Sequence, residues 1–188
     1  IIFNGEIYNY KVLRSDLENK GFEFNTNSDT EVILSLIADQ GIDAVKKLRG
    51  MFSFCVWDNT KDEVFLVRDQ FGIKPLYVYR DEQKIIFSSE IKAIINLPDI
   101  NLNFELHGLN DYFKFRYIQS PYTLFQKNEK ISSGNYIKIT KEGYAHYCYY
   151  DISYETVSYF EKNETTIISE IQLLLRDSVQ AHLMSEVP

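Results

Sequence analysis

Two hydrogen-bond donors that could stabilise a negative charge are adjacent near the start of the chain, in the segment FNGEIYNY. Asn4 carries a side-chain amide, and Gly5 has a backbone N–H that a ligand can approach closely because glycine lacks a side chain. Amide hydrolysis passes through a tetrahedral oxyanion, and each donor aimed at that charge is worth roughly 10²- to 10³-fold in rate. Asn-Gly is also a leading turn signal, so the dipeptide alone favours an ordinary turn.

Acidic residues follow in the same part of the chain. Glu6 continues the first motif, and Asp29 lies in the segment NSDTEVIL. Ser28 and Glu31 form the pattern of a capping box, with Ser28 as the N-cap of a helix and Glu31 reaching back to it. Asp29 alone is typical of a first helical turn, where the helix dipole favours negative charge. The helix is predicted to end at Gly41.

Other nucleophilic and metal-binding residue types are sparse. The two cysteines, Cys55 and Cys148, lack CxxC spacing, and the burial habit of cysteine favours a structural role for both. The three histidines, at positions 107, 146 and 182, are far apart and share no short ligand spacing. The sequence therefore predicts neither a metal site nor a disulfide framework.

The charge balance argues against a nucleic acid partner, because the net charge is −7 and no cluster of Lys and Arg interrupts it. No apolar run reaches the roughly 18 residues that would span a bilayer. The chain also does not open on a charged segment leading an apolar one, as a signal peptide would. We expect no nucleic acid or membrane partner, and a cytoplasmic protein.

Helices and strands alternate in blocks along the chain. Helical periodicity is predicted for residues 8–20, 29–40, 42–48, 90–96, 104–116 and 163–184. Four short segments rich in aromatic and β-branched residues predict an antiparallel meander: MFSFCVWD, EVFLVRD, PLYVYR and KIIFSS. The first of these is apolar on both faces, which indicates a sheet covered on both sides. A further hairpin is predicted in GNYIKIT and YAHYCYY.

Four segments match one family in order and spacing: FNGEIYNY (3–10), NSDTEVIL (27–34), RGMFSFCVWD (49–58) and RDQFGIKPLY (68–77). A fifth segment, SSEIKAI (88–94), follows them. They resemble the N-terminal glutaminase domain of asparagine synthetase B-type enzymes, which are class II glutamine amidotransferases. The resemblance implies the α+β fold of the N-terminal-nucleophile hydrolases, with antiparallel β-sheets sandwiched between helices (αββα). No catalytic role follows for Arg68 and Asp69, which read as an ordinary strand-end pair.

The resemblance also implies a division of the chain. Residues 1–150 would form the glutaminase domain without its first segment, 151–163 a linker, and 164–188 the first helix of an ATP-dependent synthetase domain. That helix is apolar enough to need a partner surface. Both ends look cut, so we expect the fold to be incomplete at the N-terminus, with exposed sheet edges.

Site residues follow by resemblance. Asn4 and Gly5 would form the oxyanion hole, and both would contact the substrate glutamine. Glu6 would hold the substrate near its α-carbon, and Asp29 would pair with its α-ammonium group. In the family, the nucleophile is a cysteine at the mature N-terminus, whose α-amino group assists as base. That cysteine and the arginine for the substrate carboxylate do not occur in this chain, so we expect the chain alone to be inactive.

The resemblance implies that L-glutamine is hydrolysed and that the ammonia amidates aspartate. ATP and Mg²⁺ would act in the synthetase domain, and no cofactor would bind in this part. Homodimer formation is one option for the longer protein. Two alternatives remain open. One is a relative with another acceptor, for example in cell-surface polysaccharide assembly, and the other is a non-catalytic glutamine-binding module.

Overall fold

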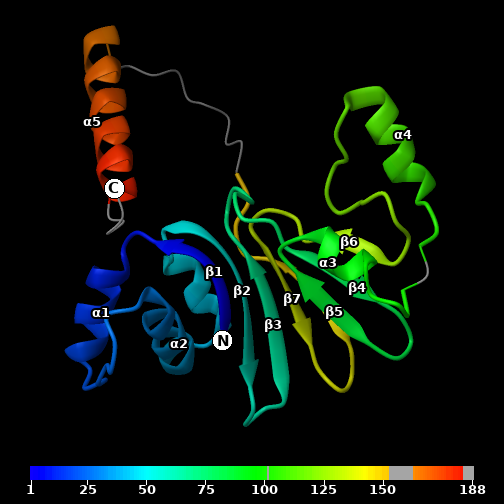
Figure 1. Ribbon diagram of the computed structural model, residues 1–188. Helices are drawn as coiled ribbons and strands as arrows, with labels where there is room; N and C mark the ends of the chain where they lie inside the picture. The colour runs from blue at the N-terminus through cyan, green and yellow to red at the C-terminus, as the bar shows by residue number, and fades with distance from the viewer. Residues whose placement is uncertain (101, 153–162, 184–188) are drawn as a thin grey trace.

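The computed structural model describes residues 1–100, 102–152 and 163–183 (Figure 1). The strands are β1 (Ile2–Ile7), β2 (Gly50–Asp58), β3 (Glu63–Arg68), β4 (Tyr77–Arg80), β5 (Ile85–Ser88), β6 (Asn128–Lys130), β7 (Asn135–Ile139) and β8 (Tyr144–Cys148). The helices are α1 (Tyr10–Glu18), α2 (Asp29–Gln40), the 3₁₀ helix η1 (Ile42–Lys47), α3 (Ile91–Ile95), α4 (Leu106–Phe115) and α5 (Glu164–His182).

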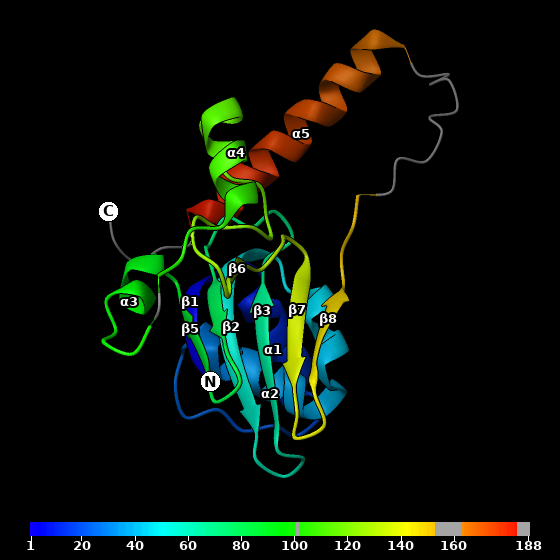
Figure 2. The same ribbon diagram turned by 90° about the vertical axis from the view of Figure 1, so that its right-hand side faces the viewer.

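Two antiparallel sheets lie face to face between layers of helices. The larger sheet has the order β1-β2-β3-β7-β8, which can be followed from left to right in Figure 2, and the smaller has the order β5-β4-β6. Helices α1 and α2 cover the outer face of the larger sheet, and α3 lies against the smaller one (Figure 1). The predicted αββα architecture is therefore confirmed.

Strand β2 is covered on both faces, as its apolar pattern predicts. Phe52 and Phe54 belong to the core that the larger sheet forms with α1 and α2. Cys55 points the other way and belongs to the core between the sheets, together with Leu76, just before β4, and Val78 of β4. Trp57 departs from this pattern, because its side chain is 61% exposed near the end of the strand.

The predicted four-stranded meander is wrong. The strands do form the hairpins β2–β3 and β4–β5, but the two hairpins belong to different sheets. The second neighbour of β3 is β7, and the second neighbour of β4 is the short strand β6, which was not predicted. The chain must therefore change sheets between Arg68 and Tyr77.

Asp69 holds the backbone at this change of sheets. Its side chain is fully buried, and its carboxylate accepts the backbone N–H of Phe52 at 3.2 Å. It also accepts the N–H groups of Phe71, Ile73 and Lys74, each at 3.0 Å. One carboxylate therefore fixes the connecting loop and attaches it to β2. The expected ordinary pair of Arg68 and Asp69 at the strand end is wrong, because Asp69 binds backbone N–H groups instead.

Arg68 complements Asp69 by binding carbonyl groups. The guanidinium donates to the carbonyl oxygens of Lys74 at 2.9 Å, Gly72 at 2.6 Å and Ile131 at 2.5 Å. The Arg68 carbonyl in turn accepts the Tyr149 hydroxyl at 2.6 Å. The segment RDQFGIKPLY thus connects the two sheets through backbone groups, and its polar residues are explained by the fold.

The remaining predicted elements are present within a residue or two of their expected bounds: α3, α4, the β7–β8 hairpin and α5. In α5, none of the described side chains is buried, although Asp177 forms an ion pair with Arg49 at 2.5 Å. No helix among the described residues combines the length and hydropathy needed to cross a membrane. The predicted linker lies almost entirely outside the described residues.

Replacement of Asp69 by Asn should destabilise the chain strongly. The carboxamide can donate but accepts through one oxygen only, so buried N–H groups lose partners at a cost of about 1–3 kcal/mol each. We expect the free energy of unfolding, measured by urea denaturation, to fall by about 3 kcal/mol or more. The exposed Asp16→Asn serves as control, and an Asp69→Asn effect as small as the control's would contradict this account.

Candidate functional site

Strand β1 carries three of the four predicted site residues: Asn4, Gly5 and Glu6. It is the first strand in the order of the larger sheet, and among the described residues it pairs with β2 alone. In that register Gly5 is opposite Phe52. Because side chains alternate along a strand, Asn4 and Glu6 project from the same face.

The register of β1 decides which backbone donors face the open edge. Tyr8 donates its N–H toward β2, to the Arg49 carbonyl at 2.7 Å. In an antiparallel ladder the backbone groups of successive residues alternate between the two sides of the strand. The N–H groups of Gly5 and Ile7 therefore point away from β2, and the Ile7 N–H is taken by Asp29 Oδ2 at 3.0 Å.

Gly5 is required by its own geometry. Its φ is +152°, and a Cβ at this position would lie 2.1 Å from the Met51 carbonyl oxygen on the paired strand. Any side chain would therefore push β1 away from β2. The plain-turn interpretation of Asn-Gly does not hold here, because both residues lie within a strand.

The Asn4 side chain is hydrogen-bonded to a residue next to the smaller sheet. Its Nδ2 donates to Ser89 Oγ at 3.2 Å, immediately after the end of β5. Asn4 itself is exposed, while Ser89 is half-buried. The amide therefore lies at the open side of the sandwich, where a ligand can reach it.

Asp29 comes from the first turn of α2 and meets β1 at Ile7. As predicted, Ser28 is the N-cap, and its side chain accepts the Thr30 N–H at 3.2 Å. One oxygen of Asp29 is used by β1, while the other lies 3.5 Å from the Thr30 hydroxyl. The structure thus brings Asp29 to the same strand edge as the Gly5 N–H, two residues along β1.

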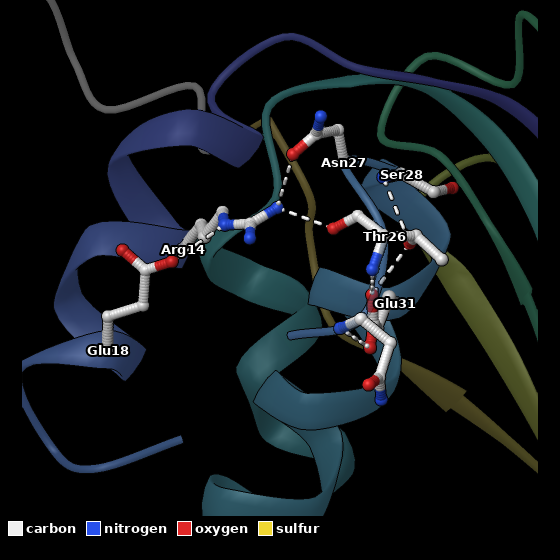
Figure 3. Close-up of polar contacts among 7 residues, drawn as sticks. Arg14, Glu18, Thr26, Asn27, Ser28 and Glu31 are labelled. Atoms are coloured by element: carbon white, nitrogen blue, oxygen red, sulfur yellow. Dashed lines mark hydrogen bonds and ion pairs between the residues drawn. The ribbon is translucent and has the colours of Figure 1, made fainter. Parts of the chain in front are cut away.

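The loop that leads to Asp29 is fixed by a polar network (Figure 3). Glu31 accepts the backbone N–H groups of Asn25 at 2.9 Å and Thr26 at 2.8 Å, and also the Thr26 hydroxyl at 2.6 Å. The predicted reach of Glu31 back to Ser28 is therefore wrong. The loop folds back over the helix start and presents its own amides to the carboxylate, while the Ser28 N–H donates to the Thr26 hydroxyl instead.

Arg14 of α1 supports the same loop from the other side (Figure 3). Its guanidinium donates to the Thr26 carbonyl at 2.6 Å and to Asn27 Oδ1 at 3.3 Å, and it pairs with Glu18 at 2.8 Å. The Asn25 N–H, followed by the Thr26 side chain and N–H, holds the pKa of Glu31 below its usual range, and the charge of Arg14 adds to this effect. The network joins α1 to the residues immediately before Asp29.

Neither cysteine replaces a nucleophile at this edge. Cys55 is buried between the sheets, and burial raises the pKa of its thiol, which disfavours the reactive thiolate. Cys148 is exposed on β8, at the other end of the larger sheet from β1. In the described part of the chain, no group of three or more His, Cys, Asp or Glu side chains is arranged to hold a metal ion.

Two cavities in the described part of the chain lie away from the Asn4 amide. One of about 370 Å³ lies between α4 and the smaller sheet, next to Tyr122 and Lys130. Another of about 450 Å³ lies beside Arg49 and the last turn of α5. The candidate site residues lie instead along β1 and at the start of α2.

Residues 1–150 match the family model described as "Glutamine amidotransferase domain". The chain belongs to this family. The chain is 37% identical to asparagine synthetase [glutamine-hydrolyzing] 1 of Bacillus subtilis, over 100% of this chain and 29% of that protein. Identity is 36% to putative asparagine synthetase [glutamine-hydrolyzing] 2 of Methanocaldococcus jannaschii, over 100% of this chain and 36% of that protein.

A third relative, asparagine synthetase B [glutamine-hydrolyzing] of Escherichia coli, is 33% identical over 98% of this chain and 28% of its own length. The chain thus spans about a third or less of these relatives. Among solved structures, the glutamine phosphoribosylpyrophosphate amidotransferase of B. subtilis, complexed with ADP and GMP, matches with a TM-score of 0.54 and 22% identity. That match covers 79% of this chain and 28% of the other, and it supports the amidotransferase fold.

The sequence did not predict the contacts of three residues that support the site: Arg14, Ser89 and Glu31. Arg14 and Ser89 reach their partners through the fold. Ser89 lies in the family-like segment SSEIKAI (88–94), but that segment alone does not indicate a contact with Asn4. Glu31 was expected at the helix start, but its partners depend on how the preceding loop turns.

Replacement of Glu31 by Gln should destabilise the loop before Asp29, because charge-assisted hydrogen bonds are stronger than neutral ones. The effect should depend on pH. A carboxyl group whose folded pKa is lowered stabilises the fold above its unfolded pKa of about 4.3, and this contribution is lost as pH falls through the folded pKa. The Tm difference between wild type and Glu31→Gln should therefore be full at pH 6 and shrink below about pH 4.

Glu82→Gln, an exposed change in the turn between β4 and β5, is the matched control and should show no such pH-dependent difference. A Tm difference for Glu31→Gln that is the same at pH 3.5 and pH 6 would contradict the proposed role of the carboxylate.

Proposed function

We propose that this chain contributes the oxyanion-binding and amino-binding parts of a glutaminase site, in a protein that makes asparagine from aspartate with ammonia taken from glutamine. The reaction in this domain converts glutamine and water to glutamate and ammonia. The observation that carries the proposal is the shared strand edge, where the outward Gly5 N–H and the Asp29 carboxylate on Ile7 lie two residues apart along β1.

The distances along β1 suit a free amino acid. Successive residues of a strand rise about 3.3 Å, so the Gly5 and Ile7 N–H groups are separated by about 7 Å. That is roughly the length of a glutamine from its side-chain carbonyl to its α-amino group. The Asp29 oxygen that does not bind Ile7 would pair with the α-ammonium group, which selects free glutamine over a peptide-bound residue.

At the other end of the substrate, Asn4 Nδ2 and Gly5 N would donate to the oxygen of the attacked carbonyl. Both donors are held before the substrate arrives, Gly5 by the ladder with β2 and Asn4 by Ser89. Donors that need no reorganisation stabilise developing charge most effectively. Glu6 projects from the same face as Asn4 and would contact the substrate near its α-carbon.

The remaining steps would use residues outside this chain. A thiol would attack the amide carbon, ammonia would leave, and water would release glutamate from the thioester. ATP and Mg²⁺ would activate the aspartate carboxylate, which ammonia then attacks, in the segments of the relatives that lie beyond this chain. We propose that the reaction takes place in the cytoplasm and that the full-length protein forms a homodimer.

Asn4→Ala in the full-length protein that carries this chain tests the proposal. Loss of one oxyanion donor should lower glutamine-dependent turnover about 10²-fold or more. Turnover with ammonium chloride in place of glutamine should remain near that of wild type, because ammonia bypasses the glutaminase site.

Asn19→Ala is the control, because it removes an exposed asparagine amide at the C-terminal end of α1, away from β1. Equal losses of both activities in Asn4→Ala would show that Asn4 supports the fold, and the proposed role would be rejected.

A further inference from the structure

The Asn4 amide is anchored by a single side chain that belongs to the other sheet. Asn4 lies on β1 of the larger sheet, and Ser89 follows β5 of the smaller one. Among the described residues, Ser89 Oγ is the one side-chain partner of Asn4 Nδ2, at 3.2 Å. The contact therefore crosses the sandwich between residues 85 positions apart in sequence.

An asparagine amide has two N–H donors on the same nitrogen. Rotation about its terminal side-chain torsion is broad, so an unanchored amide samples orientations in which neither donor faces a given point. A hydrogen bond from one N–H to a fixed acceptor orients the plane of the amide and leaves the second N–H for a ligand. Such an anchor reduces the reorganisation that the amide must undergo as negative charge develops.

Ser89 is itself fixed by the backbone on both sides. The preceding residue, Ser88, pairs with Tyr77 of β4, and its hydroxyl accepts the Glu90 N–H at 3.1 Å. Helix α3 begins directly after Glu90, and its Ile94 is fully buried against the smaller sheet. The hydroxyl that meets Asn4 is thus presented between a paired strand and a packed helix.

We propose that Ser89 is a positioning residue for the oxyanion hole, and that its hydroxyl holds the Asn4 amide with one N–H directed at the reacting carbonyl. This inference rests on the proposed glutaminase function. Ser89 does not touch the substrate in this account. Its contribution appears in the transition state, so it should change kcat for glutamine hydrolysis far more than KM.

The test uses the full-length protein and four variants: Ser89→Ala, Ser89→Thr, Asn4→Ala and the double variant Asn4→Ala/Ser89→Ala. Glutamate release gives kcat and KM, ammonia-dependent turnover reports the rest of the protein, and Tm reports the fold. Ser15→Ala, an exposed serine on α1, is the matched control.

We expect Ser89→Ala to lower the kcat for glutamate release about 10-fold, less than the loss of the donor itself. KM and ammonia-dependent turnover should stay within about 2-fold of wild type, and Ser89→Thr, which keeps the hydroxyl, should recover most of kcat. In the Asn4→Ala background, the further change Ser89→Ala should have little effect on kcat, because a residue that acts through Asn4 has nothing left to position.

The outcomes distinguish the positioning role of Ser89 from the proposed glutaminase function. If Asn4→Ala lowers glutamate release but Ser89→Ala does not, or if the Ser89 loss is the same with and without Asn4, the positioning role is overturned and the glutaminase proposal stands. If Asn4→Ala itself leaves glutamate release unchanged, the oxyanion role of Asn4 fails and the inference fails with it. Should Ser89→Ala not fold, Ser89→Cys replaces it, because sulfur is a weak acceptor of similar size.

Discussion

The pairing register of β1 against β2 is the constraint on which the candidate site depends. A shift by one residue would exchange the two sides of the strand and would turn the Gly5 N–H inward. Two glycines allow the strands to approach closely enough to keep this register. A Cβ on Gly5 would lie 2.1 Å from the Met51 carbonyl oxygen, and a Cβ on Gly50 would lie 2.1 Å from the Glu6 carbonyl oxygen. The close contact of backbones thus sets the positions of the donors.

Around β1, charged side chains fix the backbone of the neighbouring loops. Asp69 collects N–H groups where the chain changes sheets, and Glu31 does the same in the loop before α2. Arg68 and Arg14 bind carbonyl oxygens of the same two loops. Fixed loops are needed because the site is assembled from elements that are distant in sequence. Asp29 reaches β1 from α2, and the Asn4 amide is met from the end of β5.

The sequence predicts local features well where a residue type has one dominant use. Ser28 caps α2, Gly41 ends it, and β2 is covered on both faces as its apolar pattern indicates. Features that depend on the path of the chain were missed. Nothing in the spacing of four strand-like segments tells whether they share one sheet, and the change of sheets at Asp69 requires contacts between residues far apart. The Asn4–Ser89 contact is hidden for the same reason.

In the proposed complex, one glutamine lies along the side of β1 that faces away from β2, from the Asn4–Gly5 donors to Asp29. A crystal structure of the full-length protein with bound L-glutamate, the hydrolysis product, tests this most directly. We expect the side-chain carboxylate within hydrogen-bonding distance of Asn4 Nδ2 and Gly5 N, and the α-ammonium group against the Asp29 carboxylate. A glutamate bound elsewhere, or bound in this place with its two ends reversed, would contradict the proposed binding mode.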